Sequence, residues 1–307
     1  MQKFSILNSQ FAMRRFIQKH GWSYAFILPS LITFTVFVLV PVVWAFVISF
    51  QEYSLVRGGA WVTPIYKNYV TAFTQFGGVF VSAIRNTLIY TLFTVTANIL
   101  IGLILASLIQ PLSNWLRTFF RAAYYLPAVT SALIIGLTWA YIFNAQWGFA
   151  NYLLRLVGLP PVRWLSDPDI ALGSVTLSAV LTVPATAVVL FSAAMGSIPR
   201  EYYEAAELDG AGPFRRWWHI TVPLIKSTTL YLVVIYTIAS FEVFERIYVM
   251  VPSGVGNSTQ TIVTQIYNNG FKDLNFGVAS AQAFVLFVMI ALVAALQFRA
   301  LRSDVEY

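Results

Sequence analysis

The sequence lacks cysteine, contains only two histidines, His20 and His219, and carries charge on only 10% of its 307 residues. Without cysteine there is no disulfide framework and no thiolate metal site. The two histidines lie far apart in the sequence, which argues against a histidine-cluster metal centre. Soluble domains carry about 25% charged residues, so the low charge content excludes that class. Apolar residues make up 58% of the chain instead.

These apolar residues gather in six long segments. Crossing the hydrocarbon core of a bilayer takes roughly 20 apolar residues in a helix. The first segment is too long for the apolar part of a signal peptide and lacks a small-residue cleavage site, so we expect it to be retained. The sequence therefore predicts an all-α multi-pass membrane protein whose six transmembrane helices cover residues 24–50, 86–109, 122–143, 171–196, 227–250 and 278–298.

The distribution of lysine and arginine predicts the orientation of the chain. The net charge of +7 does not indicate nucleic-acid binding, because the basic residues are scattered between apolar runs. One side of the predicted membrane carries Lys3, Arg14, Arg15, Lys19, Arg117, Arg121, Arg200, Arg215, Arg216, Lys226, Arg299 and Arg302. The other side carries Arg57, Lys67, Arg85, Arg155, Arg163 and Lys272. Since cytoplasmic loops are enriched in basic residues, we expect both termini in the cytoplasm.

The most polar connection, residues 197–226, lies on the predicted cytoplasmic side. Pro199 suits the first turn of a helix, and the carboxylates of Glu201 and Glu204 favour its positive end. Gly210 supplies a stop for this helix, and Pro213 can open a second one. Helices that rest on lipid favour basic polar faces, whereas the first of these two is acidic. The loop is therefore predicted to dock onto a protein.

The same loop resembles the EAA signature of permease subunits in binding-protein-dependent ABC importers. The resemblance lies in Glu204, Ala205, Ala206, Gly210, Ile220 and Pro223, with Val222 where the family pattern has leucine. Supporting similarity extends over nearly the whole chain, in residues 85–88, in residues 125–127 with Trp139, and in residues 244–248. The sugar-type subfamily is the most similar, although residues 253–257 replace a glycine–glycine–proline turn that is frequent there.

The resemblance implies a division of labour between subunits. The chain would form half of the translocation pathway for a sugar, oligosaccharide or related polyol. Glu201 and the signature residues would bind a separate ATPase subunit. The implied partners are two copies of that ATPase, a second homologous permease, an extracytoplasmic solute-binding protein and the lipid bilayer. The implied location is the cytoplasmic (inner) membrane of a prokaryote.

The resemblance also implies that the chain is not itself an enzyme. It contains no G-x-x-x-x-G-K-[ST] phosphate-binding loop. We therefore expect no cofactor in this chain, with ATP and magnesium bound by the partner ATPase. The implied domains are a cytoplasmic segment (1–23), a six-helix permease domain (24–299) and a cytoplasmic tail (300–307).

Three ionisable residues fall within the fifth predicted helix. Glu242 and Arg246 have the i, i+4 spacing that allows an ion pair on one helix face. Glu245 has no local partner, and the sequence leaves open whether it faces the pore or pairs with another helix. Phe241 and Trp139 could stack on a sugar in the substrate pathway, or serve in packing. Polar residues within the spans, among them Asn98 and Thr182, are typical of helix–helix contacts.

Other classes of protein compete with this interpretation. An ion-gradient-driven secondary transporter would show matched interrupted helices in its two halves, which the sequence does not indicate. A membrane-embedded enzyme would need a catalytic motif such as H-E-x-x-H or G-x-S-x-G, and neither is found. An ABC importer permease for a solute other than a sugar remains a further alternative.

Overall fold

The computed structural model describes residues 25–54, 58–251 and 255–301. The expected N-terminal segment (1–23), most of the expected tail and part of the turn at 253–257 lie outside the described residues. In chain order the elements are η1 (Thr35–Leu39), α2 (Val40–Ile48), β1 (Gln51–Ser54), β2 (Gly58–Trp61), α3 (Lys67–Thr74), η2 (Gln75–Gly77), α4 (Val79–Ile109), α5 (Asn114–Tyr125), η3 (Leu126–Val129), α6 (Ala132–Ile142), α7 (Phe149–Leu156), α8 (Ala171–Leu181), α9 (Ala185–Gly196), α10 (Arg200–Leu208), α11 (Pro213–Arg216), η4 (Trp217–Thr221), α12 (Val222–Leu224), α13 (Lys226–Phe241), α14 (Glu245–Met250), α15 (Ile262–Tyr267), η5 (Asn268–Lys272) and α16 (Phe276–Leu301).

The described chain has enough apolar helix for the six predicted spans. Four helices qualify by length and composition: Ala25–Ile48, Val79–Ile109, Ala171–Gly196 and Phe276–Ala300. Two bent pairs of helices also pass this test when each pair is taken together, as a broken span or as a re-entrant loop. Asn114–Val129 meets Ala132–Ile142 at 91°, and Pro213–Leu224 meets Lys226–Phe241 at 66°. If each bent pair is one span, the number is six, as the sequence predicts.

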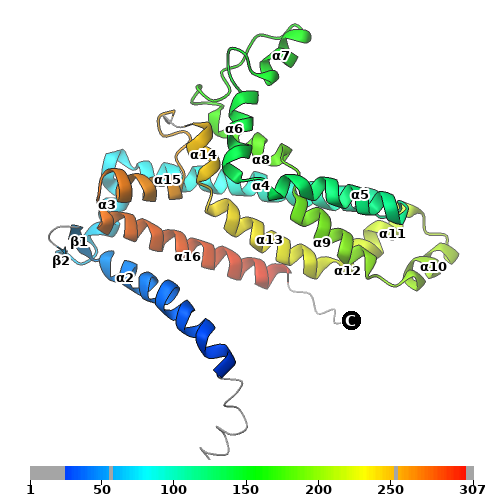
Figure 1. Ribbon diagram of the computed structural model, residues 1–307, viewed down its shortest axis with the longest axis horizontal. Coiled ribbons are helices and arrows are strands. Elements are labelled where there is room, and N and C mark those ends of the chain that lie inside the picture. Colours follow the sequence, from blue (N-terminus) through cyan, green and yellow to red (C-terminus); the bar gives the residue numbers. More distant parts are fainter. Residues whose placement is uncertain (1–24, 55–57, 252–254, 302–307) are drawn as a thin grey trace, which may run out of the picture.

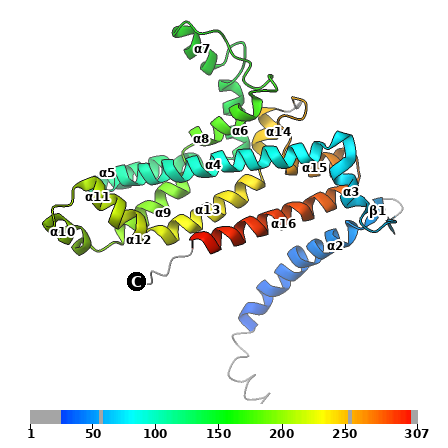
Figure 2. The same ribbon diagram turned by 180° about the vertical axis from the view of Figure 1, so that it is seen from behind.

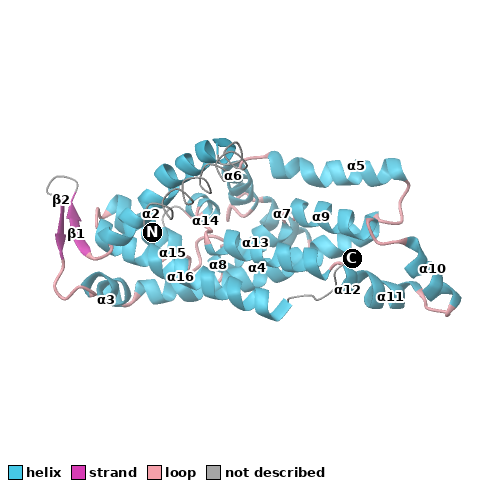
Figure 3. Ribbon diagram, turned by 90° about the horizontal axis from the view of Figure 1, so that it is seen from below, coloured by secondary structure: helices cyan, strands magenta, loops and turns pink. Residues whose placement is uncertain are grey.

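The long helices α4, α13 and α16 run side by side along the long axis of the molecule (Figure 1). The β-hairpin and α3 lie at one end of this axis, and α10 and α11 lie at the other (Figures 1 and 2). Helices α6 and α7 project sideways from the bundle, whereas α5 lies along its flank (Figures 1 and 3). The loop 197–226 is therefore far from the hairpin.

Helices α4 and α9 approach each other closely in the core. A Cβ atom built on Gly102 of α4 would overlap the Cβ of Ala187 on α9. Ala187 itself is completely buried. Small residues allow two helices to approach this closely in a membrane, where packing rather than water exclusion holds helices together. Around this contact lies an apolar cluster that includes Val95, Ile99, Ala106, Phe191 and Leu232.

Two predicted spans differ from straight helices. In the third, the chain leaves the helical conformation at Thr130 and Ser131, whose ψ angles are 138° and 137°. Pro127 lies just before this break, in the 3-10 turn η3, and contributes no backbone N–H. The fifth span also ends early, because α13 stops at Phe241 and Phe244 has a φ of −136°.

The early end of α13 overturns the expected ion pair between Glu242 and Arg246. The i, i+4 rule requires one continuous helix, and here the break separates the two residues onto different elements. Glu242 is exposed after the end of α13, and Arg246 lies in α14. Among the described residues Arg246 instead donates a hydrogen bond from Nη1 to the Oγ of Ser178 on α8, at 3.1 Å.

The loop between α6 and α8 is organised by one buried amide, that of Asn151 on α7. Its Nδ2 donates to the carbonyl oxygens of Ala145 and Val162, both at 2.9 Å. Its Oδ1 accepts from the backbone N–H of Val162 at 3.0 Å and from Nε1 of Trp164 at 2.9 Å. Trp164 also stacks on Phe143, with ring centroids 5.3 Å apart. This tryptophan is thus part of the protein's packing.

The contact between α4 and α9 can be tested with a pair of glycines. Gly102→Ala places a methyl group against Ala187 and is expected to lower stability, since overpacking costs about 1–3 kcal/mol. Gly173→Ala, on α8, meets nothing within 4 Å and is the matched control. The midpoint of thermal unfolding in detergent, followed by size-exclusion chromatography, should fall for the first variant only. Equal midpoints for both variants would contradict the close approach.

Candidate functional site

The predicted helix–turn–helix in residues 197–226 is present. Helix α10 begins after Pro199 and ends before Asp209. Gly210 then adopts a left-handed conformation, with a φ of 74°, and the N–H of Ala211 donates to the carbonyl oxygen of Ala206 at 2.9 Å. This is the turn geometry that favours glycine after a helix. Pro213 opens α11, so the predicted start, stop and restart of the loop are confirmed.

Most signature residues lie on the exposed surface of this loop. Glu201, Glu204 and Ala205 of α10 are exposed, and Ala206 is half-buried. Ile220 and Pro223 lie elsewhere, on η4 and α12, which lead the chain back towards α13. The signature therefore has two parts. One part lies on the protruding helix α10, and the other, Ile220 and Pro223, lies on the segment that leads back to α13.

The structure adds two exposed apolar residues to this surface. Leu208, at the end of α10, is 91% exposed, and Phe214, in α11, is 75% exposed. Sequence reasoning did not single out either residue. The signal that could have found them is their apolar character in a segment otherwise rich in charge, beside Glu207, Asp209 and Arg215.

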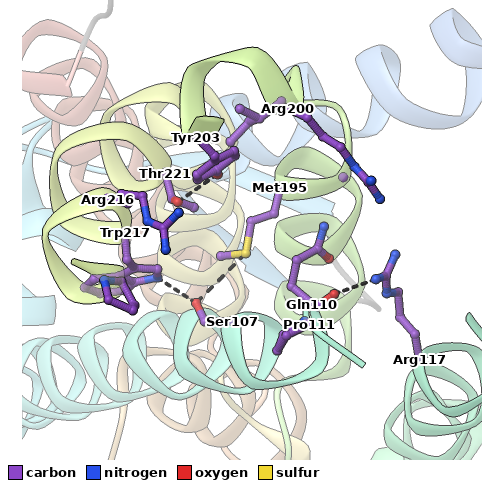
Figure 4. Close-up of a pocket in the computed structure, with 13 residues that line it drawn as sticks. Ser107, Gln110, Pro111, Arg117, Met195, Arg200, Tyr203, Arg216, Trp217 and Thr221 are labelled. Atoms are coloured by element: carbon purple, nitrogen blue, oxygen red, sulfur yellow. Dashed lines mark hydrogen bonds between the residues drawn. The ribbon is translucent and has the colours of Figure 1, made fainter. Parts of the chain in front are cut away.

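Three polar contacts tie the loop to the bundle and to itself. The Nε1 of Trp217 donates to the Oγ of Ser107 on α4 at 2.8 Å. The hydroxyl groups of Tyr203 and Thr221 lie 2.9 Å apart. These contacts are shown in Figure 4. Nη1 of Arg216 lies 2.7 Å from Oε2 of Glu207, which is the one ion pair among the described residues. Together they hold α10 and α11 beside the end of α4.

A polar cavity of about 260 Å³ lies deeper in the bundle, where the fourth span is interrupted between α8 and α9. The interruption frees backbone groups, and the N–H of Ala187 is satisfied by the hydroxyl oxygen of Tyr236 on α13, at 3.0 Å. Thr94 and Ser240 place their hydroxyl oxygens 3.1 Å apart across α4 and α13. The polar side chains that line the cavity are those of Tyr90, Thr94, Asn98, Thr182, Thr186, Tyr236, Ser240 and Arg246.

Asn98 makes this cavity chemically unusual. Its Oδ1 is buried and has no hydrogen-bond partner among the described residues. Buried polar atoms normally have partners, so each exception calls for an explanation. The sequence suggested that Asn98 and Thr182 hold helices together. Thr182 does join two helices, because its Oγ1 accepts from Nε1 of Trp139 on α6 at 3.1 Å. Both residues also line the cavity.

The three residues predicted for the substrate pathway occupy different environments. Glu245 is exposed in the first turn of α14 and does not line the cavity. Trp139 is half-buried and donates from Nε1 to the Oγ1 of Thr182, at 3.1 Å. Phe241 is only 1% exposed and packs in an apolar cluster with Phe80 and Ile262. The structure does not bring these three together. Among the charged residues of this region Arg246 reaches the cavity.

Comparisons with known proteins agree with this architecture. A family model described as the binding-protein-dependent transport system inner membrane component matches residues 98–304. The probable ABC transporter permease protein YurN of Bacillus subtilis (strain 168) is 30% identical over 287 residues, which cover 92% of this chain and 97% of that protein. The arabinooligosaccharides transport system permease protein AraP of the same organism is 30% identical over 286 residues, which cover 92% and 90%.

A solved structure shows the same fold. A chain from a bacterial ABC transporter involved in the import of the acidic polysaccharide alginate matches with a TM-score of 0.83 and 24% identity, over 96% of this chain and 100% of that chain. Because the family model spans well over half of the sequence, and the two curated relatives align along nearly all of it, the chain belongs to the family of inner membrane components of binding-protein-dependent transport systems.

Proposed function

We propose that this chain is a permease subunit of an ATP-driven importer and forms half of the translocation pathway for a sugar, oligosaccharide or related polyol. The observation that carries the proposal is the combination, in one member of this family, of a protruding acidic loop and a polar cavity in the bundle. No observation favours a secondary transporter, because the chain's relatives are ABC transporter permeases.

The substrate class rests on the chemistry of the cavity and on the relatives. Its polar lining consists of six hydroxyl groups, the amide of Asn98 and the cation of Arg246. Such groups can exchange hydrogen bonds with a polyhydroxylated solute. Leaving a buried polar group without a hydrogen-bond partner costs free energy. The relative AraP is a permease of an arabinooligosaccharide transport system, which supports a carbohydrate. Trp139, whose Nε1 donates to Thr182 at the cavity wall, belongs to this pathway. Phe241 is assigned to packing, and a role for Glu245 in the pathway stays a prediction.

The partners follow from surfaces that the chain leaves open. The most apolar window of the first span, Ala25–Ile48, buries none of its residues within the chain, which supports a second homologous permease beside it. Glu201, Glu204, Ala205, Leu208 and Phe214 form the surface for a separate ATPase, of which the transporter holds two copies. That ATPase binds ATP and magnesium.

The remaining assignments concern placement in the cell. An extracytoplasmic solute-binding protein delivers the substrate at the end of the molecule with the hairpin. Both termini and the loop 197–226 face the cytoplasm of a prokaryote, and the chain lies in its inner membrane. The excess of basic residues around this loop supports that orientation.

The orientation is testable because the chain has no cysteine of its own. In intact cells, Glu207→Cys should remain unlabelled by a membrane-impermeant maleimide and become labelled after permeabilisation. Val157→Cys, which is 70% exposed in a connection that the lysine and arginine count assigns to the outer side, should be labelled in intact cells and serves as the positive control. The reverse pattern would invert the proposed topology.

The coupling surface is tested by Glu204→Lys. The change replaces a carboxylate on an exposed helix by a cation. We expect Glu204 to bind an arginine of the ATPase, and a lysine at this position would repel that arginine. We expect the ATPase to be lost on co-purification, and ATP hydrolysis stimulated by loaded binding protein to disappear. Glu52→Lys makes the same change on the exposed hairpin, at the other end of the molecule, and should leave co-purification of the ATPase unchanged. Full association and hydrolysis in Glu204→Lys would refute the coupling role.

The cavity is tested by Asn98→Leu, which removes its unpaired amide. Loss of one hydrogen bond to substrate costs about 1.4 kcal/mol, or about tenfold in affinity. We therefore expect the apparent KM of uptake to rise about tenfold, with ATPase association unchanged. Thr74→Val, a comparable loss of polarity on the exposed part of α3, is the control. If uptake kinetics are the same in both variants, the cavity is not on the pathway.

A further inference from the structure

A second hollow, separate from the polar cavity, lies between the loop 197–226 and the end of the second span. Its volume is about 480 Å³. Its walls come from the last turns of α4 and α9, from α10 and α5, and from α11 with η4 (Figure 4). We call it the arginine pocket, because Arg117, Arg200 and Arg216 all line it.

The positive charge of the arginine pocket is not neutralised by the residues that line it. None of the described residues that line it is an aspartate or glutamate. Arg216 has an acidic partner, Glu207, whose side chain is 69% exposed. Arg117 donates from Nη2 to the backbone carbonyl oxygens of Gln110 and Leu112, which leaves its positive charge uncompensated. Arg200 is exposed and has no acidic partner among the described residues.

Two polar atoms of the pocket's residues lack hydrogen bonds altogether. The Nε of Arg117 and the Oε1 of Gln110 are both buried, and neither has a partner among the described residues. The Nε of Arg117 is a donor and the Oε1 of Gln110 is an acceptor. A single ligand that pairs with both atoms must therefore accept a hydrogen bond at one point and donate one at another. Unpaired buried groups of this kind are costly, and here they belong to two residues of the same pocket wall.

We propose that the arginine pocket binds a phosphate-bearing ligand that also carries a hydroxyl group, either the headgroup of an anionic phospholipid or a free phosphate. Guanidinium groups bind phosphate oxygens through paired, charge-assisted hydrogen bonds. A phosphate group can accept from more than one arginine at once, and Arg117 and Arg200 line the pocket without an acidic partner among the described residues. The hydroxyl group of the ligand supplies the donor that Gln110 lacks.

The position of the pocket suits both sources of phosphate. It lies at the end of the spanning helix α4, beside Trp217, whose indole suits the interface between lipid and water. Anionic headgroups lie at the cytoplasmic side of such an interface, where basic residues attract them. Because the walls come from both the loop and the spans, a ligand in the pocket braces α10 and α11 against α4.

The experiment uses the assembled transporter, stripped of lipid in a detergent without phosphate groups, with the nucleotide sites of the ATPase filled by a non-hydrolysable ATP analogue. Inorganic phosphate and short-chain phosphatidylglycerol are titrated separately in a calorimeter. Arg117→Gln and Arg200→Gln should each weaken binding of the effective probe by about tenfold, the value of one charge-assisted hydrogen bond. Arg215→Gln removes the same charge from a neighbouring exposed position outside the pocket and should leave it unchanged.

The outcomes separate the sources and the alternatives. Tighter binding of phosphatidylglycerol, with a diacylglycerol lacking phosphate inactive, identifies the headgroup. Tighter binding of inorganic phosphate identifies the free anion. The Arg200 side chain makes no hydrogen bond among the described residues, so Arg200→Gln still tests the proposal if Arg117→Gln misfolds. The proposal is wrong if neither probe binds, if Arg215→Gln weakens binding equally, or if the pocket variants release the ATPase, which would make the arginines a protein contact.

Discussion

Hydrocarbon offers no hydrogen-bond partner, so every backbone group that a spanning helix releases must be satisfied by the protein. The arrangement of this chain follows from that constraint. Between α8 and α9 the helix is interrupted, and the hydroxyl oxygen of Tyr236 accepts from the freed N–H of Ala187. An interruption is tolerated in a membrane only where it is buried in protein or lines a wet cavity. Here it does both, and the polar cavity lies at the break.

Much of this organisation could be predicted from sequence. The six apolar segments, the loop 197–226 and the need for a left-handed residue at Gly210 all follow from local rules, because composition, helix caps and glycine geometry act within a few residues. The sequence also identified the family through a motif in that loop. These features do not depend on what lies next to them in space.

The wrong pairing arose where long-range contacts decide. The pairing of Glu242 with Arg246 presumed a continuous helix, and no local sequence feature indicates that α13 ends at Phe241. Arg246 bonds to Ser178, 68 residues away. The sequence left open whether Phe241 stacks on a sugar or serves in packing, because its neighbours Phe80 and Ile262 come from other parts of the chain. Spacing in the sequence cannot distinguish an aromatic ring that faces a pore from one that faces a core.

Helix α9 has a mechanical consequence. It begins at Ala185, at the edge of the polar cavity, and ends at Gly196, four residues before α10 starts at Arg200. Its 12 residues form a rod, which at 1.5 Å per residue is about 18 Å long. A hydrogen-bonded helix resists compression, and the close contact at Gly102 fixes its side against α4. An axial push on the loop would therefore be carried along α9, beside α4, to the wall of the cavity.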